Sequence, residues 1–505
     1  MNYNTLSGSA KLYKKLETYS LGQEVTSGEV PNIAIISTVD AAANKRLVES
    51  VEYGVRSLNG TVKVFSMAEF GQFNKINPMT AKYAAGFRKV SAQNAEAIIR
   101  TNLIDGVVAI TDCDITAAGI IEGAAKVNCP ILLLPTGVNL ASIDSGRRGN
   151  LQVLGAAACG KLNSRQSEEM IKNAFVPQCL SNDFDSASTF FVLAEAMGFC
   201  VPGASCGLLN SGGQYRNAVA TGAQIYKSAK DFFSSKKLLT RGSLGNAMAL
   251  CLAIGGEIGA LNLASNLVKN YEPQIAHGLI AEYSVKVPLL LSGENQNCSV
   301  LREIGIFPIL KQLASSPKLI DESALTYSGE KLKNTLAATE SANQTPVSNN
   351  ARIILVKGSA AEHGGYVQPA KHTPASFSGK AWVYDGLEAA DKALLANSIP
   401  TGSILVVHNC VDTYVTSLAY AIEGMQKQNE IAVITDGLCE KTSVLVVTRC
   451  TPDSLSNEEF ANIQNGDTLE IDLSRGRINT NILSKEQKSR AKKNSVKKQQ
   501  FFFVN

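Results

Sequence analysis

Three consecutive segments, DGVVAIT (105–111), TAAGIIEGAAKV (116–127) and PILLLPTGV (130–138), decide the fold of the first half of the chain. The first and third segments are short and strongly apolar, which is typical of buried strands, and the middle segment has helical spacing. A strand–helix–strand unit favours a parallel sheet that is covered on both faces. The apolar runs NIAIIST (32–38) and TVKVFS (61–66) predict two further strands of this sheet.

The pattern changes twice farther along the chain. Residues 179–310 are mostly helical, and the run 244–268 is apolar nearly all round, which predicts a buried central helix. Beyond residue 350, runs such as ARIILVKG (351–358) and GSILVVHN (402–409) predict many strands and few helices. The predicted fold class is therefore α/β, with an N-terminal parallel-sheet domain and a strand-rich, barrel-like C-terminal domain.

Residues 329–350 are polar and lack an apolar period, which indicates an exposed connection between two domains. We predict an N-terminal α/β domain at 1–335, a linker at 336–350, a C-terminal β-rich domain at 351–485 and a basic tail at 486–505.

Positive charge is concentrated at the C-terminal end of the chain. Residues 485–505 contain seven basic residues and one acid, Glu486, so this segment carries +6 and the net charge of +4 leaves −2 for the remainder. A basic tail can contact nucleic acid or an acidic partner, but no platform of aromatic and basic residues accompanies it. We expect a solvated tail and no binding of nucleic acid.

The composition is that of an ordinary globular α/β protein, with 45% hydrophobic residues, 18% charged residues and 40 glycines. No run of eighteen apolar residues predicts a membrane span, and the N-terminal residues lack the pattern of a signal peptide, so a cytoplasmic location is expected. The 11 cysteines are scattered and form no C-x-x-C pair, which predicts that most of them are small buried apolar residues.

Several glycine-rich motifs follow one another in a characteristic order. The second half contains KGSAAEHG (357–364), FSGKAWVYD (377–385), IPTGSILVV (399–407), TDGLCE (435–440) and GDTLEID (466–472). The first half contains DGVV (105–108), CDI (113–115), Cys179, EAMG (195–198), PG (202–203) and GG (255–256). In this order the motifs resemble those of the dihydroxy-acid and sugar-acid dehydratases, over roughly residues 30 to 485. The resemblance implies a shared fold and ancestry, whereas the function depends on the site residues.

The resemblance also implies a chemistry. Members of this family are hydro-lyases that abstract a proton next to a carboxylate and expel a β-hydroxyl. An iron–sulfur cluster held by three cysteines is the Lewis acid that takes the hydroxide. A magnesium ion, bound by carboxylates and a modified lysine, holds the acid end of the substrate, and a serine is the base.

The motifs place Cys113 and Cys179 at two of the three cluster-cysteine positions, but Ala43 stands at the third. Asp114 is a residual metal ligand. Gln72 stands where the family has a metal-binding aspartate, and Ile115 stands where it has the modified lysine. Alanine and isoleucine offer no ligand atom, so most of the metal-binding positions are lost.

In the C-terminal half, residues that the family uses at its site are also replaced by other types. Residues 410–416 replace a glycine-rich loop that carries another metal-binding glutamate, and Glu440 stands at the position of the serine base. Glu440 is a candidate base because burial can raise the pKa of a carboxylate, and the alternative is an ordinary surface acid. Cys200 and Cys206 are expected to line a helix end and a loop.

Two functional interpretations follow. In the first, the chain is a pseudoenzyme that has lost hydro-lyase activity, holds no cofactor, and binds a small acid or pairs with a partner. In the second, it is an active hydro-lyase on a hydroxy or sugar acid, with a site rebuilt around Cys113, Asp114, Cys179 and Glu440. The resemblance implies a homodimer or a heterodimer with an intact relative. It also predicts that residues 435–440 converge with the two cysteines in a cleft between the domains.

Overall fold

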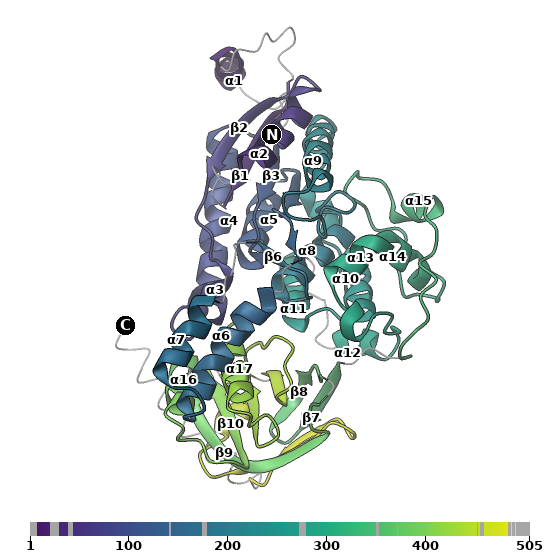
Figure 1. Cartoon of the computed structure of the whole chain (residues 1–505). Helices are drawn as coiled ribbons and strands as arrows, with labels where there is room; N and C mark the ends of the chain where they lie inside the picture. Colours follow the sequence, from purple (N-terminus) through teal and green to yellow (C-terminus); the bar gives the residue numbers. More distant parts are fainter. Residues whose placement is uncertain are drawn as a thin grey trace. The chain divides into compact units, whose positions relative to one another are not determined.

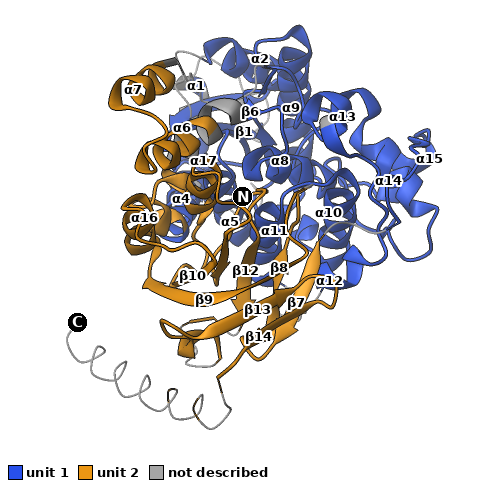
Figure 2. Ribbon diagram, turned by 60° about the horizontal axis from the view of Figure 1, so that its bottom comes forward, with its two compact units in different colours: residues 1–72, 85–143, 177–351 blue, residues 73–84, 144–176, 352–505 orange. Residues whose placement is uncertain are grey.

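The structure is a computed structural model that describes residues 8–20, 30–38, 44–140, 143–173, 179–271, 279–349, 353–370, 372–451, 453–454 and 459–482, together with Glu486 and Arg490. The chain divides into two compact units, coloured separately in Figure 2: residues 1–72, 85–143 and 177–351, and residues 73–84, 144–176 and 352–505. The predicted domain boundaries stay predictions. Among the helices that the structure describes, none combines the length and apolar character needed to cross a bilayer.

The first unit is built on a parallel sheet. Its strands are β1 (Asn32–Ser37), β2 (Thr61–Ser66), β3 (Gly106–Ile110) and β4 (Ile131–Leu134), in the order β2-β1-β3-β4. The first three of these strands are labelled in Figure 1. Every residue of β1, β3 and β4 is buried, as expected for a sheet that is covered on both faces. The predicted parallel-sheet α/β fold is confirmed.

Helices make up most of the remainder of this unit. They are α1 (Gly8–Ser20), α2 (Lys45–Arg56), α4 (Ala84–Thr101), α5 (Asp114–Lys126), α8 (Ser186–Ala196), α9 (Gly212–Lys230), α10 (Arg241–Ile254), α11 (Ile258–Lys269), α12 (Leu279–Ser284), α13 (Cys298–Ile304), α14 (Ile306–Ala314) and α15 (Leu332–Ala337). The short elements are β5 (Val138–Asn139), β6 (Leu180–Ser181), η3 (Ser235–Leu238) and η4 (Gly293–Asn295).

Glycines allow α2 and α9 to lie in backbone contact. A Cβ atom on Gly54 of α2 would lie 2.2 Å from the carbonyl oxygen of Val219, and one on Gly222 of α9 would lie 2.2 Å from that of Val51. These distances are well below van der Waals contact, so any side chain at either position would force the two helices apart.

The predicted single helix at 244–268 is wrong in one respect. The segment is buried as expected, but it forms two helices, α10 and α11. Gly255 ends α10 in the left-handed conformation (φ 71°), and the carboxylate of Glu257 then caps α11 by accepting from the amides of Gly259 and Ala260. A glycine C-cap followed by an acidic N-cap ends one helix and starts the next, even within a continuous apolar run.

The second unit contains a closed eight-stranded barrel, which confirms the barrel-like C-terminal domain. The strand order is β10-β11-β12-β8-β7-β14-β13-β9. The strands are β7 (Ile354–Gly358), β8 (Ala361–Val367), β9 (Ser376–Asp385), β10 (Ser403–His408), β11 (Ile431–Thr435), β12 (Val446–Thr451), β13 (Thr468–Asp472) and β14 (Arg477–Thr480). Strands β9 to β12 are parallel neighbours, and the other pairings, apart from that of β7 with β14, are antiparallel.

Side chains alternate between the two faces of the barrel wall. In β10, Ile404 and Val406 belong to one buried cluster, and Leu405 and Val407 belong to another that includes residues of the covering helices. The remaining elements of this unit are α6 (Ile143–Ala158), α7 (Ser164–Asn173), α16 (Leu387–Leu395), α17 (Thr416–Gly424), η2 (Ala81–Tyr83) and η5 (Phe460–Asn462), together with most of α3 (Gln72–Ile76).

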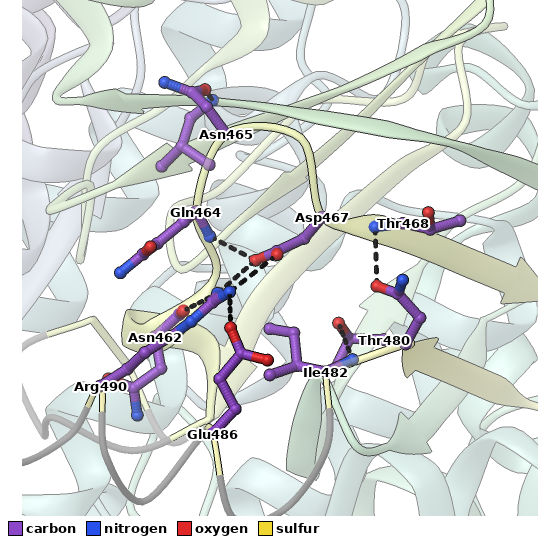
Figure 3. A network of polar contacts seen from close by, with 11 residues as sticks. Asn462, Gln464, Asn465, Asp467, Thr468, Thr480, Ile482, Glu486 and Arg490 are labelled. Carbon is purple, nitrogen blue, oxygen red and sulfur yellow. Dashed lines mark hydrogen bonds and ion pairs between the residues drawn. The ribbon is translucent and has the colours of Figure 1, made fainter.

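An ion-pair network fastens the last described residues to the barrel (Figure 3). The guanidinium of Arg490 donates to both carboxylate oxygens of Asp467, at 2.6 and 3.1 Å, and to the carbonyl of Asn462 at 3.1 Å. It also donates to Glu486 at 2.6 Å. One residue of the predicted basic tail is therefore a fixed part of the fold. Residues 491–505, with the terminal FFFVN, lie outside the described residues.

Candidate functional site

Polar side chains gather where the strands of the parallel sheet end. Parallel strands present their carboxyl ends at one edge, and ligands of such sheets bind there, close to the point where the strand order reverses. Glu69, which follows β2, accepts hydrogen bonds at Oε1 from the hydroxyls of Thr38 (3.0 Å) and Thr111 (2.9 Å) and from the amide of Asp112 (3.1 Å). One carboxylate thus joins the ends of β1, β2 and β3.

Asp112 is the most strongly perturbed acid at this edge. Its two oxygens accept from the amide (2.8 Å) and the hydroxyl (2.6 Å) of Thr136, which follows β4. Burial raises the pKa of Asp112 to about 8, and the charge of Glu69 acts in the same direction, whereas the hydrogen bonds from Thr136 lower it. Asp112 is therefore able to hold a proton near neutral pH, as a general acid or base must.

The predicted site residues Cys113 and Asp114 come next in the chain, at the start of α5. Both are buried, and the Sγ atom of Cys113 lies 4.0 Å from Oδ1 of Asp114. Oδ1 of Asp114 also accepts from the amide of Ile115 (3.0 Å), and Oδ2 accepts from the hydroxyl of Ser186 (2.6 Å). Both oxygens of the residual metal ligand are therefore hydrogen-bonded within the protein.

The other predicted cysteines are also buried. Cys179 immediately precedes β6, which pairs with β5 on the chain segment that follows β4. Cys200 and Cys206 lie in the loop after α8, as predicted. Burial raises the pKa of the Cys200 thiol well above its ordinary value, and the charge of Glu195 acts in the same direction.

The residue types around Asp114 do not fit a magnesium ion. Ile115 is an aliphatic side chain that is only 6% exposed, and Asp114 already accepts hydrogen bonds from protein groups. Within the described ranges, no three or more His, Cys, Asp or Glu side chains are grouped so that they could hold a metal ion. Ala43 and the side chain of Gln72 lie outside the described residues.

In the second unit, Glu440 is buried, with 8% of its surface exposed, so the alternative of a surface acid is wrong. Its amide donates to the hydroxyl of Thr416 (3.1 Å), and its Oε2 accepts from the hydroxyl of Tyr420 (3.3 Å). Both partners belong to α17, so the loop after β11 is attached to the start of this helix. The convergence of residues 435–440 with Cys113 and Cys179 stays a prediction.

The motif Thr435-Asp436-Gly437 has a structural role at this end of the barrel. Asp436 accepts from the amides of Cys410 (2.9 Å) and Ser454 (3.2 Å). A Cβ atom on Gly437 would lie 2.8 Å from the carbonyl oxygen of Cys410. The motif therefore joins the loops that follow β10, β11 and β12, and only glycine fits at its third position.

Sequence reasoning missed Glu69, Asp112 and Thr136 in the first unit and the partners of Glu440 in the second. A usable signal was present for the first set, because each of these polar residues lies within three residues of the end of a predicted apolar strand. Such positions in a parallel sheet share one edge, and this edge is where sites form.

The comparisons with known proteins agree with this architecture. Residues 31–335 match the family described as dihydroxy-acid/6-phosphogluconate dehydratase N-terminal, and residues 341–504 match its C-terminal counterpart. The dihydroxy-acid dehydratase of Caldanaerobacter subterraneus is 26% identical over 470 residues, which cover 88% of this chain and 84% of that protein. The dihydroxy-acid dehydratase of Pyrococcus furiosus is 26% identical over 472 residues, which cover 88% and 85% of the two chains. The chain belongs to the dihydroxy-acid/6-phosphogluconate dehydratase family.

Proposed function

We propose that this protein keeps the dehydratase fold but has lost hydro-lyase activity on dihydroxy and sugar acids, and that it binds a small acid or pairs with a partner. The observation that carries the proposal is the environment of Asp114. Its neighbour Ile115 is a buried aliphatic residue, and both oxygens of Asp114 accept hydrogen bonds from the protein.

The chemistry explains why these changes matter. Hydroxide is a poor leaving group, and its expulsion needs a Lewis acid or a proton donor. Magnesium requires several hard oxygen ligands, and an isoleucine supplies none. The serine base is replaced by Glu440 as well, so the losses affect separate steps and a single reversion should not restore turnover.

The test is anaerobic reconstitution with iron and sulfide, followed by assays on 2,3-dihydroxy acids and aldonic acids. The Pyrococcus furiosus relative, treated in parallel, is the control for successful reconstitution. We expect a colourless protein and no keto-acid product. Binding of about two irons per chain, with keto acid above the level of a Cys113→Ser variant, would contradict the proposal.

The second candidate function is an active hydro-lyase with a site rebuilt around Cys113, Asp114, Cys179 and Glu440. It is favoured by the burial of Glu440 and its hydrogen bond from Tyr420, because a buried carboxylate is suited to accept a proton. If this function is correct, keto acid forms with the unmodified protein and is lost in a Glu440→Gln variant.

We also propose a cytoplasmic location and a symmetric homodimer, or a heterodimer with an intact relative. The family resemblance supports the dimer. Light scattering at micromolar concentration is expected to give twice the chain mass of 53.7 kDa. A monomer mass, both alone and when mixed with an intact relative, would count against both forms.

A further inference from the structure

Helix α1 presents its apolar side chains to the outside. Leu12, Leu16 and Tyr19 have the spacing i, i+4 and i+7, so they share one face of the helix, and Tyr13 lies beside them. These four residues are between 47% and 70% exposed. A surface helix of a globular protein ordinarily turns its apolar face toward the core, so the orientation of α1 is reversed.

A buried lysine holds α1 in this orientation. Lys14 lies two residues from both Leu12 and Leu16, and therefore on the opposite face of the helix. It forms an ion pair with Asp105 in which both side chains are buried. Asp105 directly precedes β3 and also accepts from the amide of Asn32, the first residue of β1 (2.9 Å). The helix is therefore attached to the amino edge of the parallel sheet, at the other end of the strands from the candidate site.

The end of α9 and the short helix η3 reach the same edge. A Cβ atom on Gly106, the first residue of β3, would lie 3.3 Å from the Cβ atom of Ala229 in the last turn of α9. The hydroxyl of Ser235 in η3 donates to the carbonyl of Cys129, two residues before β4 (2.5 Å). Three elements that are distant in sequence thus meet at one edge of the sheet.

An aromatic ring is displayed between α9 and η3. Phe232 is 54% exposed and has a φ of 52°, in the left-handed region. Its amide donates to the carbonyl of Ala229 (3.2 Å), and the amide of Phe233 donates to that of Ser228 (2.9 Å), which is a Schellman motif. Glycine is the usual residue at this position, because a side chain in the left-handed conformation costs free energy. The chain therefore exposes a phenylalanine where the backbone alone favours glycine.

Lysines accompany these apolar groups. The exposed lysines of α1, α5, α9 and η3 are Lys15, Lys126, Lys227, Lys230, Lys236 and Lys237. Asp231 is the one acid in the segment 227–237, and α1 carries three lysines and one acid. This edge of the sheet is therefore positively charged as well as apolar.

The combination distinguishes between possible partners. A symmetric contact with a second copy would place this positive surface against itself. Single-stranded nucleic acid is bound by stacking on several aromatic rings and planar arginines, whereas the cations here are lysines, and Leu12 and Leu16 have no ring. A basic helix with leucine and aromatic side chains on its other face is typical of a membrane surface, where lysines attract anionic lipids and apolar side chains enter the headgroup region.

We infer that the amino edge of the parallel sheet docks on an anionic lipid surface, with the apolar face of α1 and the ring of Phe232 in the headgroup region. The lysines contact the charged lipid headgroups, and no spanning helix is needed. The carboxyl edge, about 20 Å away along β3, faces away from the lipid. This inference goes beyond the proposed function and holds whether or not hydro-lyase activity is lost.

The experiment is co-sedimentation of the full chain with vesicles. The probe vesicles contain phosphatidylcholine and phosphatidylserine, and the control vesicles contain phosphatidylcholine alone. We expect at least about tenfold tighter binding to the anionic vesicles, and we expect added salt to weaken it. No binding to the anionic vesicles, or equal binding to both kinds, overturns the inference.

Charge variants locate the surface. Lys236→Gln combined with Lys237→Gln should weaken vesicle binding about tenfold or more, because each lysine near an anionic surface contributes about fivefold. Lys45→Gln combined with Lys286→Gln is the matched control, since it removes the same charge from side chains that are 73% and 56% exposed and that each pair with a glutamate four residues away. Equal weakening in the two double variants would mean that only net charge matters, which overturns the inference.

Phe232→Gly separates the ring from the fold. Glycine is the usual residue at this position, so we expect the Tm to rise while binding to anionic vesicles falls about fivefold or more. Leu12→Ser combined with Leu16→Ser removes the apolar face of α1 and should weaken vesicle binding by at least as much. Vesicle binding equal to wild type in both of these proteins overturns the inference.

Two further measurements exclude the other partners. Light scattering should give the same mass for wild type and for Leu12→Ser combined with Leu16→Ser, and a change from dimer to monomer would mean that α1 covers a second copy. Binding of a single-stranded RNA oligonucleotide, lost in Lys236→Gln combined with Lys237→Gln and without vesicle binding, would identify a nucleic-acid surface. Either result contradicts docking on lipid.

Discussion

Asp112 is the residue whose ionisation should dominate the pH dependence of stability in the first unit. Burial and the charge of Glu69 raise its pKa to about 8 in the folded protein, from the ordinary value of 3.8. Between these two values the folded state holds a proton that the unfolded state has released. The stability contributed by the protonated carboxyl is therefore complete below pH 4 and is lost as the pH rises toward 8.

This predicts that wild-type stability declines from pH 5 to pH 8 more steeply than that of an Asp112→Asn variant, in which nothing titrates at this position. The slopes of unfolding free energy against pH should differ between the two proteins by on the order of 1 kcal/mol per pH unit. Urea unfolding of both proteins at pH 5, 6, 7 and 8 measures it. Parallel pH profiles would show that Asp112 is ionised in the folded state.

At the scale of elements, the crossing of α2 and α9 depends on the absence of side chains at their contact. A Cβ atom at Gly222 would lie 2.2 Å from the carbonyl oxygen of Val51, and backbone on both sides leaves no room for adjustment. We expect Gly222→Ala to lower the free energy of unfolding by about 1–3 kcal/mol.

Gly86 of α4 is the matched control, because a Cβ atom there meets nothing within 4 Å. Gly86→Ala should stabilise the protein by about 0.5–1 kcal/mol, since alanine loses less backbone entropy in a helix than glycine. Denaturant titration of both variants gives the two values. Equal effects of the same sign would contradict the close crossing of α2 and α9.

At the scale of the whole molecule, Arg490 joins a residue beyond β14 to Asp467 of the barrel unit (Figure 3). The Arg490 and Asp467 side chains are 14% and 11% exposed, so their bidentate ion pair is partly shielded from water. Replacing Arg490 by glutamine should make the chain around Glu486 and position 490 more accessible to trypsin and lower the free energy of unfolding by about 1–3 kcal/mol.

Arg475→Gln is the control for this change, since Arg475 is 75% exposed and its pair with Asp472 is 3.7 Å long. Exposed pairs of this kind contribute about 0–1 kcal/mol, so little change is expected. The measurement is the rate of tryptic cleavage, read by intact-mass spectrometry, together with urea unfolding. Identical cleavage rates in both variants would contradict a fastening role for Arg490.

Local pattern was sufficient for much of this protein. Short apolar runs predicted the strands of the parallel sheet, because a strand buried on both faces is apolar throughout. The changed pattern beyond residue 350 predicted the barrel. The order of the motifs likewise predicted the family, and it identified Cys113, Asp114 and Glu440 as candidate site residues.

Tertiary structure alone decided which groups meet. Glu69, Asp112 and Thr136 lie close together only because parallel strands end at one edge of the sheet. Residues 144–176 belong to the barrel unit, where Gly155 of α6 packs against Ala421 of α17. The physical reason is that periodicity reports whether a face is buried, whereas hydrogen-bond partners and close contacts depend on residues that are distant in sequence and become neighbours only in the folded chain.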